Sequence, residues 1–333
     1  MSKVSVIGSG SWGTALAVLL SNNGHEVVLW SRIKEKAEKI AKDRENKEYL
    51  PGIILSDNIK VTYIDDDVKN SDIILLSVPS KAIRETAKRF LNCFSENQII
   101  VNVAKGIEEG SLLRLSQIIE EVVPFCRVAV LSGPSHAEEV GKGMVTACVA
   151  ASESIEVAEA VQKIFMSPVF RVYTNTDIIG VEIGGALKNL IALAAGISDG
   201  VGFGDNSKAA LMTRGIVEVS RLGVAMGGKA ETFSGLSGIG DLIVTCTSRH
   251  SRNRMAGVLL GKGKSLEDTL KEVHMVVEGV NTAKAAYDLS VKYNVNMPIT
   301  KEIYDVLFFG QDTKQAVVNL MTRDKTAEYN FIN

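Results

Sequence analysis

The chain has 333 residues, a length at which one hydrophobic core no longer suffices, so two substantial domains are expected. With 37 Lys and Arg against 39 Asp and Glu, the net charge of −2 gives no global attraction for nucleic acid or anionic lipid. The four cysteines are scattered and have no matching histidine cluster, which indicates reduced thiols in a cytoplasmic protein and no structural metal site.

The first predicted strand, Val4–Ile7, runs directly into a Gly-x-Gly-x-x-Gly turn that opens an apolar helix near residue 11. In such a turn Gly8 permits the tight bend, Gly10 lets backbone amides approach a pyrophosphate, and Gly13 lets the helix lie close to the sheet. Because Glu26–Trp30 is predicted as a second strand, this strand–helix–strand context favours a dinucleotide site, with the pyrophosphate at the helix N-terminus, over an ordinary glycine-rich turn.

The end of the second strand bears on which dinucleotide is bound. An NAD-binding domain usually offers Asp or Glu to the ribose hydroxyls there, but this chain has Ser31 and Arg32. A guanidinium group suits a 2′-phosphate better than a bare diol, so NADPH is predicted as the preferred cofactor over NADH. The alternative is that Arg32 is only a solvated cation beside Lys34 and Lys36.

Short apolar runs then alternate with helical patterns as far as about residue 177, which predicts a doubly wound sheet of the Rossmann type. The later strands are predicted at 72–78, 98–104, 127–131, 146–151 and 170–173, and helices at 81–94, 112–122 and 155–165. The two domains are therefore expected at 1–177, for the dinucleotide, and at 178–333.

From Ile178 onward the strand signals vanish, so the second domain is predicted to be all-α, with glycine-rich breaks at 196–204, 227–228, 235–240 and 261–263. The apolar stretch Ile178–Ile197 is long, but Glu182, Lys188 and Asn189 interrupt it, and such groups are costly in hydrocarbon. No membrane span is predicted.

Ligands of an open α/β sheet lie beyond the carboxyl ends of its strands, and three strand exits contain polar groups: 77–80, 104–106 and 132–135. Lys105 is the sharpest candidate, because a cation there would polarise a substrate carbonyl; the alternative is a surface lysine at the start of a loop. Ser135 also has two interpretations. It contacts a ligand, or it forms a helix-capping box with Glu138.

Lys188 is the candidate acid or base of the second domain. Its neighbours three and four positions away on a helix are small or apolar, so no acidic partner lies on its own helix face. Either its ammonium reaches water along an apolar stem, or it acts in a cleft, paired with an acid from elsewhere such as Asp241.

The stretch 247–254 combines hydroxyls, guanidinium groups and an amide ahead of a helical run at 255–260. Such groups at a helix start suit a phosphate. A solvated basic loop is the alternative, and nucleic-acid binding is disfavoured because aromatic residues are not interleaved.

Together these motifs resemble the bacterial type of NAD(P)-dependent glycerol-3-phosphate dehydrogenase over essentially the full length of the chain. The resemblance rests on the segments Gly8–Ala15, Leu131–Ala137, Ala186–Asn189, Gly238–Leu242 and Ser248–Asn253. It implies an N-terminal Rossmann domain followed by a helical domain of the 6-phosphogluconate dehydrogenase C-terminal type. It also implies a cytoplasmic homodimer that reduces dihydroxyacetone phosphate to sn-glycerol 3-phosphate for phospholipid synthesis.

The resemblance also implies a role for individual residues. Lys188 is the implied catalytic proton donor or acceptor. The implied substrate-binding residues are Lys105, Gly133, Ser135, Lys188, Asp241, Ser251, Arg252 and Asn253. The implied cofactor-binding residues are Gly8, Gly10, Ser11, Trp12, Gly13, Arg32, Tyr49, Lys105, Ala137, Arg252, Val276 and Glu278. Two rival functions stay open: another oxidoreductase of the 6-phosphogluconate or β-hydroxyacid dehydrogenase type, and a non-catalytic protein that senses NADPH.

Overall fold

The N-terminal half of the chain folds around an eight-stranded sheet in the order β3-β2-β1-β4-β5-β6-β7-β8. The computed structural model describes residues 1–273, 276–325 and 327–328. The strands are β1 (Lys3–Ile7), β2 (Glu26–Trp30), β3 (Ile59–Thr62), β4 (Ile73–Leu76), β5 (Ile99–Asn102), β6 (Arg127–Ser132), β7 (Thr146–Ala151) and β8 (Phe170–Asn175). The central strands are almost wholly apolar because helices cover both faces of the sheet.

The strand order reverses beside β1, since the chain runs from β1 to β2 and β3 and then returns to place β4 on the other side of β1. The helices and 3-10 turns of this half are α1 (Ser11–Asn22), α2 (Lys34–Asp43), η1 (Asp65–Val68), η2 (Ser80–Ala82), α3 (Ile83–Arg89), η3 (Leu91–Cys93), α4 (Leu115–Val122), α5 (Ala137–Gly141) and α6 (Ile155–Phe165). Ligands of such sheets bind in the crevice at the point of reversal, beyond the carboxyl ends of the strands.

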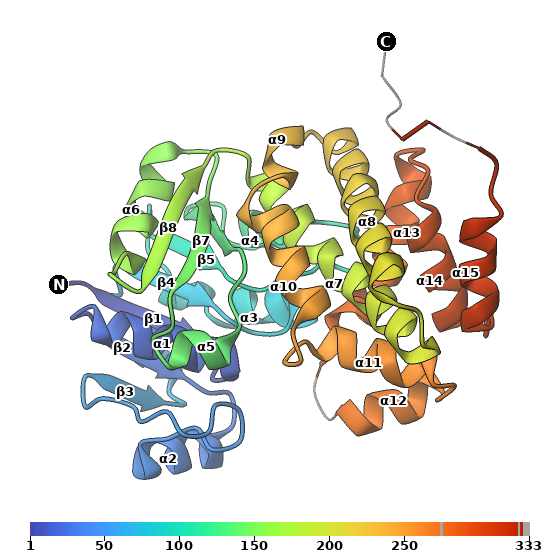
Figure 1. Cartoon of the computed structure of the whole chain (residues 1–333). Coiled ribbons are helices and arrows are strands. Elements are labelled where there is room, and N and C mark those ends of the chain that lie inside the picture. The colour runs from blue at the N-terminus through green and yellow to red at the C-terminus, as the bar shows by residue number, and fades with distance from the viewer. Residues whose placement is uncertain (274–275, 326, 329–333) are drawn as a thin grey trace.

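The C-terminal half is helical, as predicted. Its helices are α7 (Ile178–Val201), α8 (Asp205–Ala225), α9 (Ala230–Phe233), the π-helical turn η4 (Leu236–Gly240), α10 (Asp241–Thr247), α11 (Arg252–Gly261), α12 (Leu266–Val273), α13 (Glu278–Lys292), α14 (Pro298–Phe308) and α15 (Thr313–Met321). Figure 1 shows these helices gathered beside the sheet. The last strand ends at Asn175 and α7 begins at Ile178, while the exact domain division at 177 stays a prediction.

Helix α7 is the central element of the helical half. By length and composition alone it is apolar enough to cross a membrane, but 94% of its most apolar window is buried inside the protein. Val181 packs with Val130 and Val149 of the sheet, whereas Leu187 and Leu190 lie in the core of the helical half. Helix α7 is therefore a buried core helix that packs against both halves of the protein.

Three sheet features differ from the sequence predictions. Strand β3 and helix α2 are missing from the predicted elements, because β3 is only four residues long and half polar. Strand β7 is antiparallel to β6, although the remaining pairs are parallel. The link between them carries only the five-residue helix α5, which is too short to form a crossover that returns a parallel strand.

Several helix boundaries also differ. The helix predicted at 81–94 is broken into η2, α3 and η3, and the helix predicted from Leu112 begins at Leu115, because Leu112 adopts a left-handed φ of 59°. The glycines at 196 and 200 do not break a helix, since α7 continues through them and ends at Gly202, where φ is 96°. The glycine-rich segment predicted as a break at 235–240 forms a π-helical turn that continues directly into α10.

Candidate active site

A cavity of about 1230 Å³ opens between the carboxyl ends of the strands and the helices α7, α11 and α13. Most of the predicted site residues line it: Gly8, Gly10, Ser11, Trp12, Arg32, Tyr49, Lys105, Ser135, Ala137, Lys188, Ser251, Arg252, Asn253, Val276 and Glu278. The other three, Gly13, Gly133 and Asp241, lie behind this wall. One cavity thus brings together residues from both halves of the chain, from Gly8 to Glu278.

The glycine-rich turn has the shape that a pyrophosphate requires. Gly8 has a φ of 117°, and a Cβ atom there or on Gly13 would strike backbone oxygens of Ser77 or Gly8. A Cβ atom on Gly10, in contrast, would have no heavy atom within 4 Å. Gly8 and Gly13 therefore close the turn tightly, while Gly10 leaves open space at the N-terminus of α1, where an anion is favoured.

Asn46 holds this turn in place, a role that the sequence analysis missed. Its side-chain amide donates to the backbone oxygen of Ser9 at 2.8 Å and to the hydroxyl of Thr14 at 2.8 Å. Asn46 is 1% exposed, although it stands in a strongly polar loop. No sequence pattern distinguishes a buried asparagine from an exposed one in such a loop, so Asn46 could not be predicted.

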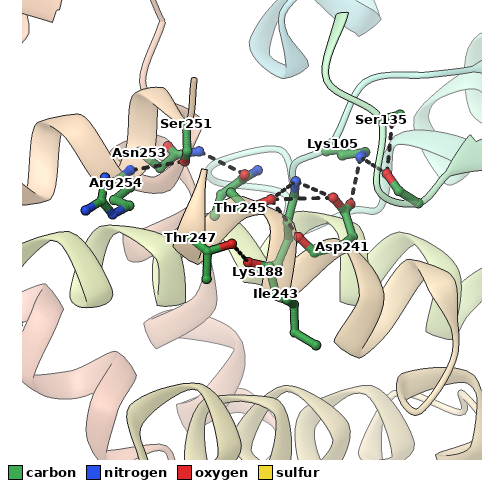
Figure 2. A network of polar contacts seen from close by, with 12 residues as sticks. Lys105, Ser135, Lys188, Asp241, Ile243, Thr245, Thr247, Ser251, Asn253 and Arg254 are labelled. Atoms are coloured by element: carbon green, nitrogen blue, oxygen red, sulfur yellow. Dashed lines mark hydrogen bonds and ion pairs between the residues drawn. The ribbon is translucent and has the colours of Figure 1, made fainter. Parts of the chain in front are cut away.

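Behind the cavity wall, one carboxylate bridges the two lysines that line it (Figure 2). Lys188 Nζ lies 2.7 Å from Asp241 Oδ1, and Lys105 Nζ lies 2.7 Å from Asp241 Oδ2. Lys188 also donates to the hydroxyl of Thr245 at 2.7 Å, and Lys105 donates to the carbonyl of Gly133 at 2.9 Å. Among the described residues each ammonium therefore has two partners, which leaves one of its three N–H donors for a ligand.

Burial sets the protonation of this cluster. Desolvation lowers the pKa of Lys188 to about 8, the nearby charge of Lys105 lowers it too, and Asp241 opposes both. For Asp241 burial acts against ionisation, but the two ammonium groups outweigh it and hold the pKa of the carboxyl below its usual range. The cluster carries a net charge of about +1 at neutral pH and suits an anionic ligand or a developing oxyanion.

Small residues on α7 explain how two lysines reach one carboxylate. A Cβ atom on Gly184 would lie 2.7 Å from the backbone oxygen of Ser237, and one on Gly185 would lie 2.7 Å from the hydroxyl of Ser132. The stem of Lys105 passes over Gly185 as well. The small face beside Lys188 thus admits the neighbouring backbone and Lys105, and the alternative of an ammonium in water is wrong, because the Lys188 side chain is 9% exposed.

The start of α11 forms another part of the wall. The helix begins at Arg252, three residues before the predicted run, and Ser251 caps it by accepting from the amide of Arg254 at 3.2 Å. The Asn253 side chain donates to Asn189 Oδ1 at 2.9 Å and accepts from the amide of Gly279 at 2.8 Å. These bonds tie α7, α11 and α13 together at the cavity, so residues 251–254 are a fixed helix start, whereas 248–250 form a turn between α10 and α11 in which residues 249 and 250 are exposed.

Ser135 does not form the predicted capping box. Helix α5 begins after His136 without a side-chain cap, and the Ser135 hydroxyl donates to the carbonyl of Gly133 at 2.9 Å. That carbonyl also accepts from Lys105. Ser135 therefore lies in the cavity wall close to Lys105, as Figure 2 shows, and the Gly133 carbonyl behind the wall accepts from both.

Arg32 and Tyr49 lie at the far end of the cavity, beyond the carboxyl end of β2. Arg32 is exposed. Lys36, which also lines the cavity, donates to the Tyr49 hydroxyl at 3.1 Å and pairs with Glu48 at 2.6 Å. The guanidinium of Arg32 is thus available to a phosphate at this end of the cavity.

Comparison with known proteins matches both halves of the chain to one family. Residues 3–158 match the model of the NAD-dependent glycerol-3-phosphate dehydrogenase N-terminus, and residues 177–318 match that of its C-terminus. The chain belongs to the glycerol-3-phosphate dehydrogenase family. Relatives named glycerol-3-phosphate dehydrogenase [NAD(P)+] include one from Fusobacterium nucleatum, which is 57% identical over 98% of this chain and 99% of its own length. One from Bacillus subtilis is 56% identical over 98% of this chain and 96% of its own length.

Solved structures agree with this membership. The glycerol-3-phosphate dehydrogenase of Coxiella burnetii is 35% identical, with a TM-score of 0.93 over 97% of this chain and 99% of that one. A ketopantoate reductase from Ralstonia eutropha has a TM-score of 0.61 at 14% identity over 95% of this chain and 99% of that one, a likeness that shows the fold alone. The fold is therefore shared with other reductases, whereas the full-length sequence match is to the glycerol-3-phosphate dehydrogenases.

Proposed function

We propose that the protein catalyses the reversible, NAD(P)H-dependent reduction of dihydroxyacetone phosphate to sn-glycerol 3-phosphate. The observation that carries this proposal is the Lys105–Asp241–Lys188 cluster, whose two lysines line a cavity of about 1230 Å³ that the glycine-rich turn also lines. A cation-rich cluster next to a cofactor is the arrangement that ketone reduction needs, since negative charge develops on the carbonyl oxygen. The names of the full-length relatives supply the substrate.

Bound in the cavity, the reduced nicotinamide supplies a hydride to C2 of the ketone. Lys188, protonated below its pKa of about 8, donates a proton to the oxygen that was the carbonyl, so the C=O bond becomes CH–OH. In the reverse direction neutral Lys188 accepts that proton. Asp241 and Thr245 hold the Nζ atom in place through bonds of 2.7 Å each.

Lys105 stabilises the same oxygen electrostatically, because it shares the Asp241 carboxylate and has one N–H donor without a partner among the described residues. We assign the substrate phosphate to the start of α11, where Ser251, Arg252 and Asn253 line the cavity. A ten-residue helix begins there, and its N-terminus favours an anion. Ser135 completes the wall on the side of Lys105, and the Gly133 carbonyl behind it accepts from both residues.

The cofactor is assigned along the rest of the cavity. Gly8, Gly10 and Gly13 shape the cradle for the pyrophosphate at the start of α1, with Ser11 and Trp12 beside it. The remaining assigned residues, on the other walls, are Arg32, Tyr49, Lys105, Ala137, Arg252, Val276 and Glu278. The exposed guanidinium of Arg32 supports NADPH as the preferred cofactor, because it would pair with a 2′-phosphate.

Three further assignments are part of the proposal. The product would supply glycerophospholipid synthesis, the protein would act in the cytoplasm, and two copies would form a homodimer. The division into a dinucleotide domain at 1–177 and a substrate domain at 178–333 is supported by the change from strands to helices after β8.

Steady-state kinetics test the proposed activity. Oxidation of NADPH and of NADH is followed with dihydroxyacetone phosphate, with 6-phosphogluconate and short β-hydroxyacids supplied with the oxidised cofactors as controls. We expect turnover with dihydroxyacetone phosphate and none with the acids. Turnover of an acid instead would establish the rival dehydrogenase. NADPH binding with no turnover of any substrate would establish the sensor.

A further inference from the structure

Ser80 connects the two halves of the protein behind the cavity wall. It follows β4 at the one polar strand exit that the site described above leaves unused. Its neighbours Pro79 and Lys81 line the cavity, but Ser80 does not, and it is 5% exposed. Its backbone amide donates to Glu278 Oε1 at 3.2 Å, and its hydroxyl donates to Glu278 Oε2 at 2.6 Å. Both oxygens of one carboxylate are thus held by a single residue from the other half of the chain.

The position of Glu278 makes this contact relevant to the cofactor. Glu278 lines the cavity and is the first residue of α13. On the sheet side, Gly106 packs against the pair: a Cβ atom there would lie 2.5 Å from Ser80 Cβ and 3.7 Å from Glu278 Oε2. The carboxylate therefore lies between the β4 exit and the β5 exit that carries Lys105.

We propose that Ser80 is a positioning residue for the dinucleotide, which holds the Glu278 carboxylate in the orientation that binds the cofactor. Each carboxylate oxygen has further acceptor capacity after it has accepted from Ser80, so Glu278 accepts from an amide or hydroxyl donor of the cofactor. Fixing a long side chain before binding saves the entropy of ordering it later. The inference rests on the assignment of Glu278 to the cofactor wall.

A double-mutant cycle tests whether Ser80 acts through Glu278. The dissociation constant of NADPH is measured by fluorescence titration without substrate, for the parent chain, Ser80→Ala, Glu278→Ala and the double variant. We expect Ser80→Ala to weaken NADPH binding about tenfold when Glu278 is present, and less than about twofold when Glu278 is already alanine. A purely structural role of Ser80 would weaken binding equally in both backgrounds.

Ser111→Ala is the matched control. The Ser111 hydroxyl also donates to a glutamate, Glu108 Oε2 at 2.5 Å, but neither residue lines the cavity, so its NADPH affinity should equal that of the parent. The proposal is overturned if Ser80→Ala loses the same affinity in both backgrounds, or none in the parent. If Glu278→Ala leaves the affinity unchanged, the assignment of Glu278 fails and the inference fails with it. Turnover of dihydroxyacetone phosphate would still stand as a separate result.

Discussion

Asp241 is the residue that lets two lysines share a buried site. Two ammonium groups brought this close would repel each other, and removing each from water costs several kcal/mol. A carboxylate between them, 1% exposed, offsets both costs and leaves a net positive charge. Burial lowers the pKa of Lys188 to about 8, and Asp241 keeps it from falling further, so the ammonium is charged at neutral pH and still weak enough to give up its proton.

Lys188→Ala is expected to lower kcat by about 10²- to 10⁴-fold, because the proton donor to the developing alkoxide is lost. NADPH affinity, measured by titration without substrate, should change little. Lys208→Ala is the control, since Lys208 also pairs with an aspartate of α7, Asp199 at 2.7 Å, and neither residue lines the cavity. Near-normal kcat for Lys188→Ala would contradict the assigned role.

The pH dependence follows from the pKa of Lys188. Reduction of the ketone needs protonated Lys188, so kcat/KM in that direction, which reports the free enzyme, should fall as the pH rises through about 8. Oxidation of glycerol 3-phosphate needs the neutral amine, so its kcat/KM should rise through the same pH and then level off. Asp241→Asn should move both inflections to lower pH, because Asp241 raises the pKa of Lys188. Inflections that do not move would assign the titration to another group.

Arg32→Asp is expected to reverse the cofactor preference. A carboxylate at the end of β2 repels a 2′-phosphate and accepts hydrogen bonds from ribose hydroxyls. The measurement is the ratio of kcat/KM for NADPH to kcat/KM for NADH. The control is Lys34→Asp, which introduces the same carboxylate at an exposed position two residues after Arg32. If Arg32→Asp lowers both values equally, Arg32 does not discriminate between the cofactors.

The sequence predicted those site residues that belong to a recognisable motif or stand out by their chemistry. Lys188 and Asp241 were singled out as a pair, and the expected contact is present at 2.7 Å. Thr245, which also holds Lys188, gave no signal, because it is one of several hydroxyls on a short helix. The role of Asn46 could not be predicted either. It depends on the burial of its side chain, and burial in a polar loop is decided by the tertiary fold.

At the scale of whole elements, α7 and α11 pack with their backbones in close contact. A Cβ atom on Gly196 or Gly200 of α7 would strike backbone oxygens of Arg254 or Val258, and one on Gly257 or Gly261 of α11 would strike those of Leu193 or Ile197. The two helix backbones thus touch directly. At this contact Asn253 donates to Asn189, the residue after Lys188, at 2.9 Å.

Gly257→Ala should therefore destabilise the protein by more than about 2 kcal/mol, since a methyl group has to push two backbones apart. The free energy of unfolding in urea is the measurement. Gly204→Ala is the control: a Cβ atom at Gly204 would have no heavy atom within 4 Å, so its effect should stay below about 1 kcal/mol. Equal stabilities would show that α7 and α11 can separate without cost.

The glycines of α7 also show why helix ends could not be predicted reliably from the sequence. A glycine that ends a helix and a glycine that admits a neighbouring helix give the same local signal, so 196–204 was predicted as a break although α7 ends only at Gly202. The long apolar elements with clear periodicity were predicted correctly. Strand β3 and the direction of β7 were not, because both depend on pairing with distant strands.

For the whole molecule, α7 makes the two halves interdependent. It packs against β6 and β7 through Val181 and forms the core of the helical half through residues such as Leu190. A buried ion pair adds to this link: Arg114, the residue before α4, lies 2.6 Å from Glu182 of α7, and both are less than 9% exposed. Breaking such a pair costs several kcal/mol, because it leaves a buried charge without a partner.

The two halves are therefore expected to unfold in one cooperative transition, although each has its own core. The chain is suited to this test because its two tryptophans, Trp12 and Trp30, both lie in the sheet half, whereas most of the helix lies after residue 177. Tryptophan fluorescence and far-ultraviolet circular dichroism during urea unfolding thus report on different halves. Coincident transitions are expected. Two separate midpoints would mean that the core of α7 and the Arg114–Glu182 pair do not couple the halves.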